Sequence, residues 1–186
     1  EKSEYGMQVK DRLEETFLAS VFTKQTSFDG SFSTMMPGPL YEFPESGGTT
    51  MAAYADMANG AKYVVTRINT FSTLYGRSQE QYLDKLDSLF FENIPGKILE
   101  KKRIEIDGVP GFDIISKTKK GDVQHYHIMV TPVEILIFKV SGKKEFVKRP
   151  EVAQFFEELH FYKTAGWKKY VPKNTAYSVE MPGTPI

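Results

Sequence analysis

Two histidines, His125 and His127, have the spacing that comes closest to a chemical site in this sequence. In a β-strand, residues i and i+2 project from the same face, so the two imidazoles would lie side by side while Tyr126 and Ile128 face the core. Two imidazoles on one face can begin a metal site, but a third ligand, His160 or a carboxylate, would have to come from another element. The alternative interpretation is a solvated polar face without any metal ligand.

Other kinds of catalytic site find little support in the sequence. Cysteine is absent, which excludes a thiol nucleophile, a disulfide scaffold and a zinc–thiolate site. Ser33 and Ser178 fall in expected strands rather than in a Gly-x-Ser-x-Gly turn, and Gly47–Gly48 lacks the lysine and hydroxyl of a phosphate loop. We therefore predict no catalytic residue, no cofactor and no enzymatic activity, and we keep a metal-dependent hydrolase using His125 and His127 as an alternative.

Two groups of residues are candidates for contacting a partner. Basic side chains gather near expected strand ends and turns, where they either keep a sheet edge from pairing or bind an anionic partner. An aromatic loop either lines a ligand groove or closes one end of the sheet. The partner-binding candidates are Lys101, Lys102, Arg103, Lys119, Lys120, Tyr41 and Phe43.

The composition indicates a globular domain with a sizeable core. The chain has 186 residues, with 24 basic and 24 acidic side chains, 14 Phe and 10 Tyr. This aromatic content argues against disorder, and the balanced charge argues against a dedicated nucleic-acid binder. No apolar run approaches the roughly 20 residues of a membrane-spanning helix.

The first half of the chain predicts a helix, three strands and a second helix. Apolar spacing predicts a helix over residues 7–20 and a strand over 31–36. A hairpin is expected from residues 49–57 and 61–71, joined by a tight turn at Asn59–Gly60. Ser78 and Gln81 form a capping box that begins the next helix, which Pro95–Gly96 ends.

The second half predicts four strands, at residues 98–106, 112–118, 123–131 and 135–140, and a final helix at 150–159. Their connections are too short for parallel crossovers, so the strands should pair antiparallel. Residues 135–138 are apolar on both faces, which predicts a central strand. The fold class is therefore α+β, an antiparallel β-sheet of about six to seven strands flanked by helices.

An internal repeat is present in the sequence. Residues 32–38 (FSTMMPG) match residues 177–183 (YSVEMPG) at an offset of 145 without a gap, and Phe22 meets Trp167 at the same offset. We interpret residues 22–163 as one domain, residues 1–21 as an N-terminal helix and the tail of a preceding repeat, and residues 164–186 as the head of a second, truncated repeat. The alternative is that the match is a coincidence, because short strand motifs followed by Pro-Gly are common.

These motifs also carry a family resemblance. The segment from Trp167 to Tyr170, followed by residues 177–185, resembles the opening of a bacterial domain of unknown function. Residues 108–111 match its central Gly-x-Pro-Gly segment, and residues 155–161 resemble its closing helix end, without the Ser of that motif. The resemblance implies a sandwich similar to that of the photosystem II extrinsic protein PsbP and of the Ran-release factor. It further implies a binding module without catalytic residues, often exported from bacteria.

Our leading hypothesis is a non-enzymatic binding or scaffold domain of unknown partner, one unit of a tandem array, located outside the cytoplasm. The alternatives are a carrier of a small apolar ligand or lipid, and the metal-dependent hydrolase. The expected partner is a protein or a small molecule and not a nucleic acid, with no transmembrane segment. A homodimer that exchanges the terminal segments is a further alternative, because an orphan head strand must pack on this domain, pair with another molecule or fray.

Overall fold

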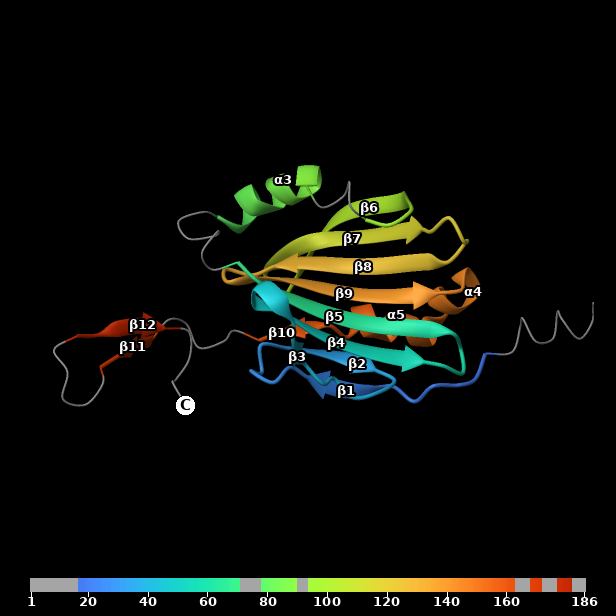
Figure 1. The fold of residues 1–186 in the computed structure, drawn as a ribbon, viewed down its shortest axis with the longest axis horizontal. Helices are drawn as coiled ribbons and strands as arrows, with labels where there is room; N and C mark the ends of the chain where they lie inside the picture. Colours follow the sequence, from blue (N-terminus) through green and yellow to red (C-terminus); the bar gives the residue numbers. More distant parts are fainter. Residues whose placement is uncertain (1–16, 71–77, 90–93, 163–167, 172–176, 182–186) are drawn as a thin grey trace, which may run out of the picture.

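The computed structural model describes residues 17–70, 78–89, 94–162, 168–171 and 177–181. At its centre is a seven-stranded antiparallel sheet in the order β3-β4-β5-β9-β8-β7-β6 (Figure 1). Its strands are β3 (Phe43–Pro44), β4 (Thr49–Asp56), β5 (Ala61–Asn69), β6 (Lys97–Ile106), β7 (Val109–Lys117), β8 (Val123–Val130) and β9 (Glu134–Gly142). The predicted α+β class is confirmed, and so is the central position of the strand that contains residues 135–138.

A second, three-stranded sheet has the order β1-β2-β10. It consists of β1 (Thr23–Thr26), β2 (Phe32–Met36) and β10 (His160–Phe161). The strand expected at residues 31–36 is therefore present, but it does not extend the main sheet. The edge strand of the main sheet is instead the two-residue β3. Both β3 and the short 3-10 helix η1 (Ser46–Gly48) lie in a segment that was expected to be a loop.

Two apolar clusters fill the two faces of the main sheet. One cluster packs β2, α4 (Lys144–Val147) and α5 (Pro150–Glu157) on the sheet, with Phe32, Phe138 and Phe155 fully buried. The other packs α3 (Gln79–Leu89) on the opposite face through Leu83 and Leu86. Helices and the small sheet thus cover the main sheet on both sides, which explains why β9 is apolar on both faces.

The predicted capping box of α3 is confirmed. The Ser78 backbone N–H donates to Gln81 Oε1, and the Gln81 backbone N–H donates to Ser78 Oγ, both at 3.2 Å. Gln79 also donates from Nε2 to the carbonyl of Val130, at 2.8 Å, which ties the start of the helix to the end of β8. These contacts fix where α3 begins.

Three local predictions were wrong. Residues 17–20 are not helical, and the rest of the helix expected over residues 7–20 lies outside the described residues. The loop between β4 and β5 has four residues rather than a tight Asn59–Gly60 turn, and of this pair only Gly60 has a positive φ. The tight turn is instead at Asp107–Gly108, where both φ angles are positive, so β7 begins at Val109 rather than at residue 112.

Asn59 is buried because its side chain holds another segment of the chain. Its amide donates to the carbonyl of Leu18 at 3.1 Å and accepts from the backbone N–H of Leu18 at 2.7 Å. Asp56 accepts from the same amide at 2.7 Å and from Ser20 Oγ at 3.0 Å. Residues 18–20 are thereby anchored to the β4–β5 loop.

The last two strands, β11 (Lys168–Tyr170) and β12 (Val179–Met181), form an antiparallel sheet of their own (Figure 1). Among the described residues, no helix is long and apolar enough to cross a membrane.

Candidate functional site

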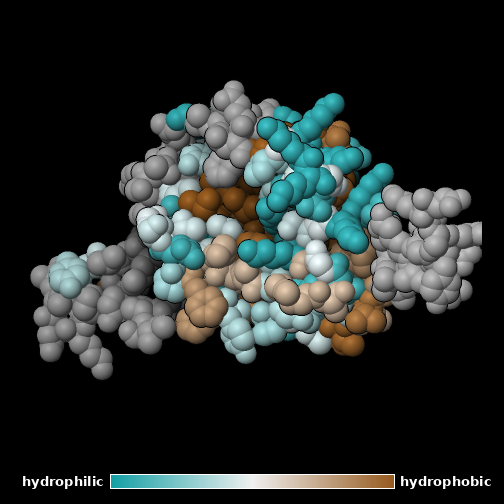
Figure 2. Space-filling view, turned by 45° about the vertical axis from the view of Figure 1, so that its right-hand side comes forward, coloured by the Kyte–Doolittle hydropathy of each residue, from teal (hydrophilic) through white to brown (hydrophobic). Residues whose placement is uncertain are grey.

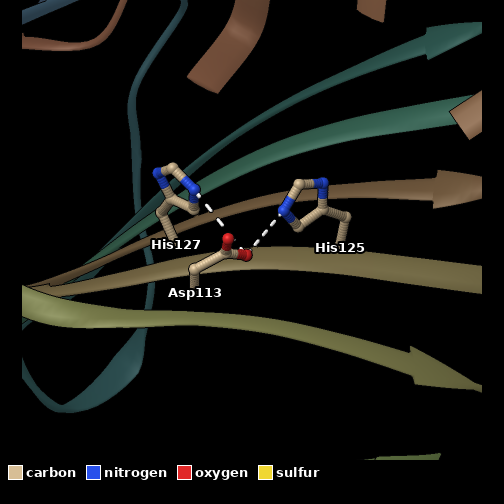
Figure 3. A group of neighbouring side chains, drawn as sticks. All are labelled: Asp113, His125 and His127. Carbon is tan, nitrogen blue, oxygen red and sulfur yellow. Dashed lines mark hydrogen bonds and ion pairs between the residues drawn. The ribbon is translucent and has the colours of Figure 1, made fainter. Parts of the chain in front are cut away.

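The two histidines meet a carboxylate, Asp113, that comes from the neighbouring strand. In the β7–β8 pair, Asp113 lies directly opposite His127, and Ile115 lies opposite His125. Paired residues project from the same face of a sheet, so all three polar side chains emerge together (Figure 3). The third ligand that the histidine pair needed is thus a carboxylate held by the adjacent strand.

The ring nitrogens of both histidines point at one carboxylate oxygen. His125 Nε2 lies 2.7 Å from Asp113 Oδ1, and His127 Nε2 lies 3.8 Å from the same atom (Figure 3). An ionised carboxylate only accepts hydrogen bonds, so His125 donates through Nε2. One possible ligand atom from each residue lies within 4.8 Å of the others.

The face that carries these histidines is covered rather than solvated, so the expectation of a solvated polar face was wrong. The Phe156 ring of α5 packs against both imidazoles, with ring centroids 4.0 Å from His125 and 4.5 Å from His127. His127 is 8% exposed, and its Nδ1 is buried with no hydrogen-bond partner among the described residues. The predicted inward orientation of Tyr126 is confirmed, because Tyr126 is buried under α3 on the opposite face.

Two groups of the site have lowered pKa values. The shift favours the charged form of Asp113 and the neutral form of His127. Burial raises the pKa of the Asp113 carboxyl, but hydrogen bonds from His125 and Lys102 outweigh it and lower the pKa to about 2. Burial lowers the pKa of His127 to about 4, and the attraction of Asp113 offsets only part of that effect. At neutral pH the site therefore holds a carboxylate beside an uncharged imidazole.

An open hollow borders the carboxylate on the side of β6. It has a volume of about 390 Å³ and is lined by Leu99, Glu100, Lys101, Lys102 and Asp113. Lys102 Nζ lies 3.0 Å from Asp113 Oδ2, although 68% of the lysine side chain is exposed. The carboxylate is thus shared between two imidazoles, of which His127 is buried and His125 half-buried, and a solvent-exposed ammonium group.

His160, the other expected third ligand, lies elsewhere. Its Nδ1 is 3.3 Å from Asp107 Oδ2 at the β6–β7 turn, and its Nε2 is 3.9 Å from Glu158 Oε2. Asp107 also accepts the backbone N–H of Phe161, at 2.9 Å. His160 therefore helps to hold β10 in place.

The basic partner-binding candidates fall into two sets. Lys101 lies 5.9 Å from the centre of the Phe112 ring, Lys102 binds Asp113, and Arg103 binds Glu80 on α3. By contrast, Lys119 and Lys120 are exposed in the turn between β7 and β8. The first set contacts groups of this chain, on both faces of β6, so the basic residues do not form one patch.

The aromatic candidates lie on the surface. Tyr41 is 66% exposed and Phe43 is 63% exposed. Phe28, in the β1–β2 turn, is 92% exposed, and its backbone N–H donates to Glu42 Oε1 at 3.2 Å, which brings it beside this segment. Sequence reasoning did not single out Phe28. Apolar groups reach the surface in separate patches between hydrophilic side chains, as the face shown in Figure 2 illustrates.

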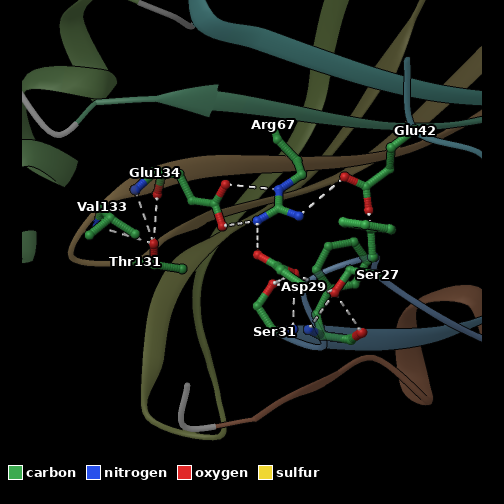
Figure 4. A network of polar contacts seen from close by, with 10 residues as sticks. Ser27, Asp29, Ser31, Glu42, Arg67, Thr131, Val133 and Glu134 are labelled. Atoms are coloured by element: carbon green, nitrogen blue, oxygen red, sulfur yellow. Dashed lines mark hydrogen bonds and ion pairs between the residues drawn. The ribbon is translucent and has the colours of Figure 1, made fainter. Parts of the chain in front are cut away.

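A second polar cluster, around Arg67 on β5, was not anticipated (Figure 4). Its guanidinium binds Glu134 through two nitrogens, at 2.8 and 2.9 Å, Asp29 at 2.6 Å and Glu42 at 3.2 Å. These contacts tie β9, the β1–β2 turn and the segment before β3 to one side chain. Burial opposes ionisation of Asp29, but hydrogen bonds from Arg67 and Ser31 hold its pKa well below its usual range.

Comparison with known proteins finds similarity at the level of the fold. No family model and no curated protein matches the chain. Cyanobacterial PsbP (CyanoP) from Synechocystis sp. PCC 6803 has a TM-score of 0.48 and 6% identity, over 78% of this chain and 95% of that chain. The Ran-binding protein Mog1p of Saccharomyces cerevisiae has a TM-score of 0.42 and 9% identity, over 77% of this chain and 96% of that chain.

A protein of unknown function from Pseudomonas aeruginosa has a TM-score of 0.39 and 15% identity, over 71% of this chain and 90% of that chain. Both architectures that the sequence resemblance implied therefore occur among similar solved structures. At these identities the similarity concerns the fold alone, and no function is transferred from it.

Proposed function

We propose that this chain is a non-enzymatic binding or scaffold domain and one unit of a tandem array. The observation that carries the proposal is a repeated pairing register. In the β1–β2 hairpin, Thr23 pairs with Met36 and Lys24 with Met35. In the β11–β12 hairpin, Lys168 pairs with Met181 and Lys169 with Glu180. Each residue of the second hairpin lies 145 positions after its equivalent, which is the offset of the sequence repeat.

The side chains that the first hairpin buries recur in chemical type at this offset. Phe32 and Met36 are fully buried against the main sheet, and the equivalent residues are Tyr177 and Met181. Tyr177 is 60% exposed, whereas Phe32 is fully buried. A chance match of strand motifs does not require the same register, so this agreement supports a second copy of the opening hairpin.

The test is to add the rest of a second domain after this hairpin. We would extend the chain after Met181 with a second copy of residues 37–163 and follow heat-induced unfolding by calorimetry. We expect a second folded domain and an unfolding enthalpy that about doubles, because this enthalpy scales with the number of folded residues. A matched control carries Val179→Pro, which blocks the β11–β12 pairing.

Two results would count against the tandem unit. If a protease removes the added residues and leaves the first domain intact, the second hairpin does not open a domain. If the unextended chain shows a doubled mass in native mass spectrometry, its hairpin is seated on another copy, which is the alternative of a homodimer through the terminal segments.

We place the partner contact at the exposed aromatic residues Phe28, Tyr41 and Phe43. Large exposed aromatic side chains are costly to leave in water and contribute strongly to protein interfaces. A photo-reactive amino acid at position 43 should cross-link a partner, whereas the same probe at the exposed Met57 in the β4–β5 loop should not. Equal cross-linking at both positions would remove this assignment. The remaining basic candidates, Lys119 and Lys120, would serve an anionic part of the same partner.

The expected location outside a bacterial cytoplasm belongs to this proposal and rests on the sequence resemblance. The apolar-ligand carrier stays an alternative, and the two buried apolar clusters on the faces of the main sheet are where such a ligand would have to be enclosed. The metal-dependent hydrolase is the second candidate, since Asp113 supplies a third ligand beside His125 and His127. Hydrolysis would require a metal ion to bind there first.

A further inference from the structure

We propose that Asp113, His125 and His127 form a binding site for a divalent transition-metal ion, with Zn²⁺ as the preferred ion. The proposal does not depend on the tandem arrangement and makes no claim that the site is catalytic. It rests on the convergence of three ligand atoms from two paired strands, and one of the three residues, Asp113, also lines an open hollow.

The backbone holds the three ligands in place. Strands β7 and β8 are inner strands of the seven-stranded sheet, so both are hydrogen-bonded on two sides. Register places Asp113 opposite His127, and the alternation along β8 places His125 on the same face. The Phe156 ring packs against both imidazoles and restricts their rotation. Ligands positioned in this way lose little side-chain freedom when a metal binds.

The distances require only a small adjustment. Zinc–ligand bonds of about 2.0–2.2 Å put neighbouring donor atoms of a tetrahedral site about 3.3 Å apart. The three donor atoms already lie within 4.8 Å of one another, and His125 Nε2 and Asp113 Oδ1 are 2.7 Å apart. A metal between them would replace the hydrogen bond from His125, whose proton would move to Nδ1. Both imidazoles would then present the Nε2 lone pair.

The donor set selects the class of ion. Two imidazole nitrogens and one carboxylate oxygen suit Zn²⁺, Co²⁺ or Ni²⁺, whereas Mg²⁺ and Ca²⁺ prefer oxygen ligands throughout. The hollow beside Asp113 leaves room for a water molecule as the fourth ligand. Three protein ligands and an open position are typical of zinc sites that exchange their fourth ligand.

Lys102 is the internal competitor of the metal. Its ammonium group binds Asp113 Oδ2, so it occupies the carboxylate from the side of the hollow. Because most of the lysine side chain is exposed, it can turn into solvent at small cost when a dication takes its place. Lys101, the preceding residue, also lines the hollow, but its ammonium group lies 5.9 Å from the centre of the Phe112 ring rather than on Asp113. The pair therefore offers a charge-matched control.

The experiment uses the full chain, without an oligohistidine tag, after treatment with a chelator. Zn²⁺ affinity is measured by competition with a chromophoric chelator, and Co²⁺ is used to record the visible absorption of a tetrahedral site. The chain has no cysteine and three histidines, which limits other sites of nitrogen or sulfur donors. We expect one Zn²⁺ per chain, and loss of at least about tenfold in affinity with His125→Gln or with Asp113→Asn. His160→Gln should leave the affinity unchanged.

The lysine pair gives a second readout that a general loss of folding cannot imitate. Lys102→Met should tighten Zn²⁺ binding by up to about fivefold, the size of an exposed ion pair, and Lys101→Met should leave it unchanged. Circular dichroism confirms that each variant is folded. The proposal is overturned if the folded wild-type chain binds no Zn²⁺, or if His125→Gln binds it as tightly as wild type. It is also overturned if His160→Gln removes binding or if the two lysine variants behave alike.

Discussion

The main sheet carries two polar clusters that differ in how fully their groups are paired. Around Arg67, one permanently charged guanidinium faces Asp29, Glu42 and Glu134, and each of its three nitrogens has a carboxylate partner. Around Asp113, two imidazoles converge on one carboxylate, and His127 Nδ1 has no partner in the part of the chain that the structure describes. The first cluster joins separate elements of the chain, whereas the second joins only adjacent strands and an exposed lysine.

The difference indicates which cluster is structural. A guanidinium fork with a carboxylate on each of its three nitrogens is already neutralised by its own chain. Imidazoles whose Nε2 atoms point at a common carboxylate can exchange a proton for a metal ion. Charge density alone therefore does not identify a binding site, because the more highly charged cluster is the one that holds the fold together.

The largest effect should follow from Arg67→Ala. Removing this side chain leaves the half-buried Glu134 and Glu42 without their counter-charge, so we expect a loss of about 3–5 kcal/mol in the free energy of unfolding. Urea denaturation measures it. Arg103→Ala is the matched control, because Arg103 also binds two carboxylates and stacks on an aromatic ring but lies at the surface. It should cost less than about 1 kcal/mol. Equal losses would show that the Arg67 cluster is not the tie between elements.

A smaller effect should appear when acid titrates the same cluster. The pKa of Asp29 is lowered in the folded state, so its contribution is complete above the unfolded pKa of about 3.8 and is lost as the pH falls below it. Arg67 and the hydroxyl groups of Ser27 and Ser31 face this carboxylate. Asp29→Asn should therefore be less stable than wild type from pH 5 to 7, and the difference should shrink toward pH 2. A difference that stays constant with pH would contradict this cause.

The smallest change in the free energy of unfolding should come from His127→Leu. Whether the variant is more or less stable than wild type is the informative result. This change removes a buried nitrogen that has no partner and leaves an apolar side chain against Phe156. We expect stability within about 1 kcal/mol of wild type, unchanged or raised, in the same urea assay. A loss of more than about 2 kcal/mol would show that the imidazole is needed to hold the sheet together, which would place the Asp113 cluster in the same class as the Arg67 cluster.

Much of the fold followed from periodicity and from turn residues. The alternation of apolar residues located β4 to β9 to within a few positions, and short connections forced the antiparallel arrangement. What periodicity could not show is which strands share a sheet. Besides β1, strand β2 pairs with β10 at the far end of the domain, and no local pattern of residues 32–36 specifies that second pairing.

The candidate site was half predictable. The spacing of His125 and His127 placed both on one face, but the third ligand depended on the register of the β7–β8 hairpin. A four-residue connection at Lys119–Asp122 would place Asp113 opposite Ile128, on the face away from the histidines. The structure has a five-residue turn, with Lys117 paired to Val123, and this shift of one residue brings Asp113 to the histidines.

The prediction of a tight turn at Asn59–Gly60 was wrong for a different reason. The Asn-Gly pair favours a two-residue turn when only local backbone preferences act. Here the Asn59 side chain is used by Leu18, 41 residues earlier, and by Asp56. The longer loop buries the amide with all of these partners in reach, and a long-range contact thereby overrides the local preference.

The pairing of β2 with β10 has a consequence for how the chain matures on the ribosome. Ser33 of β2 pairs with His160 of β10, so the second edge of β2 stays unpaired until β10 has been synthesised. At synthesis rates of about 5–20 residues per second, that delay is on the order of ten seconds. The β11–β12 hairpin, which the tandem proposal takes as a second opening hairpin, follows β10 in the chain. On that proposal, correct closure depends on the first hairpin being seated on its own sheet, where Phe32 and Met36 are buried, before the later hairpin leaves the exit tunnel.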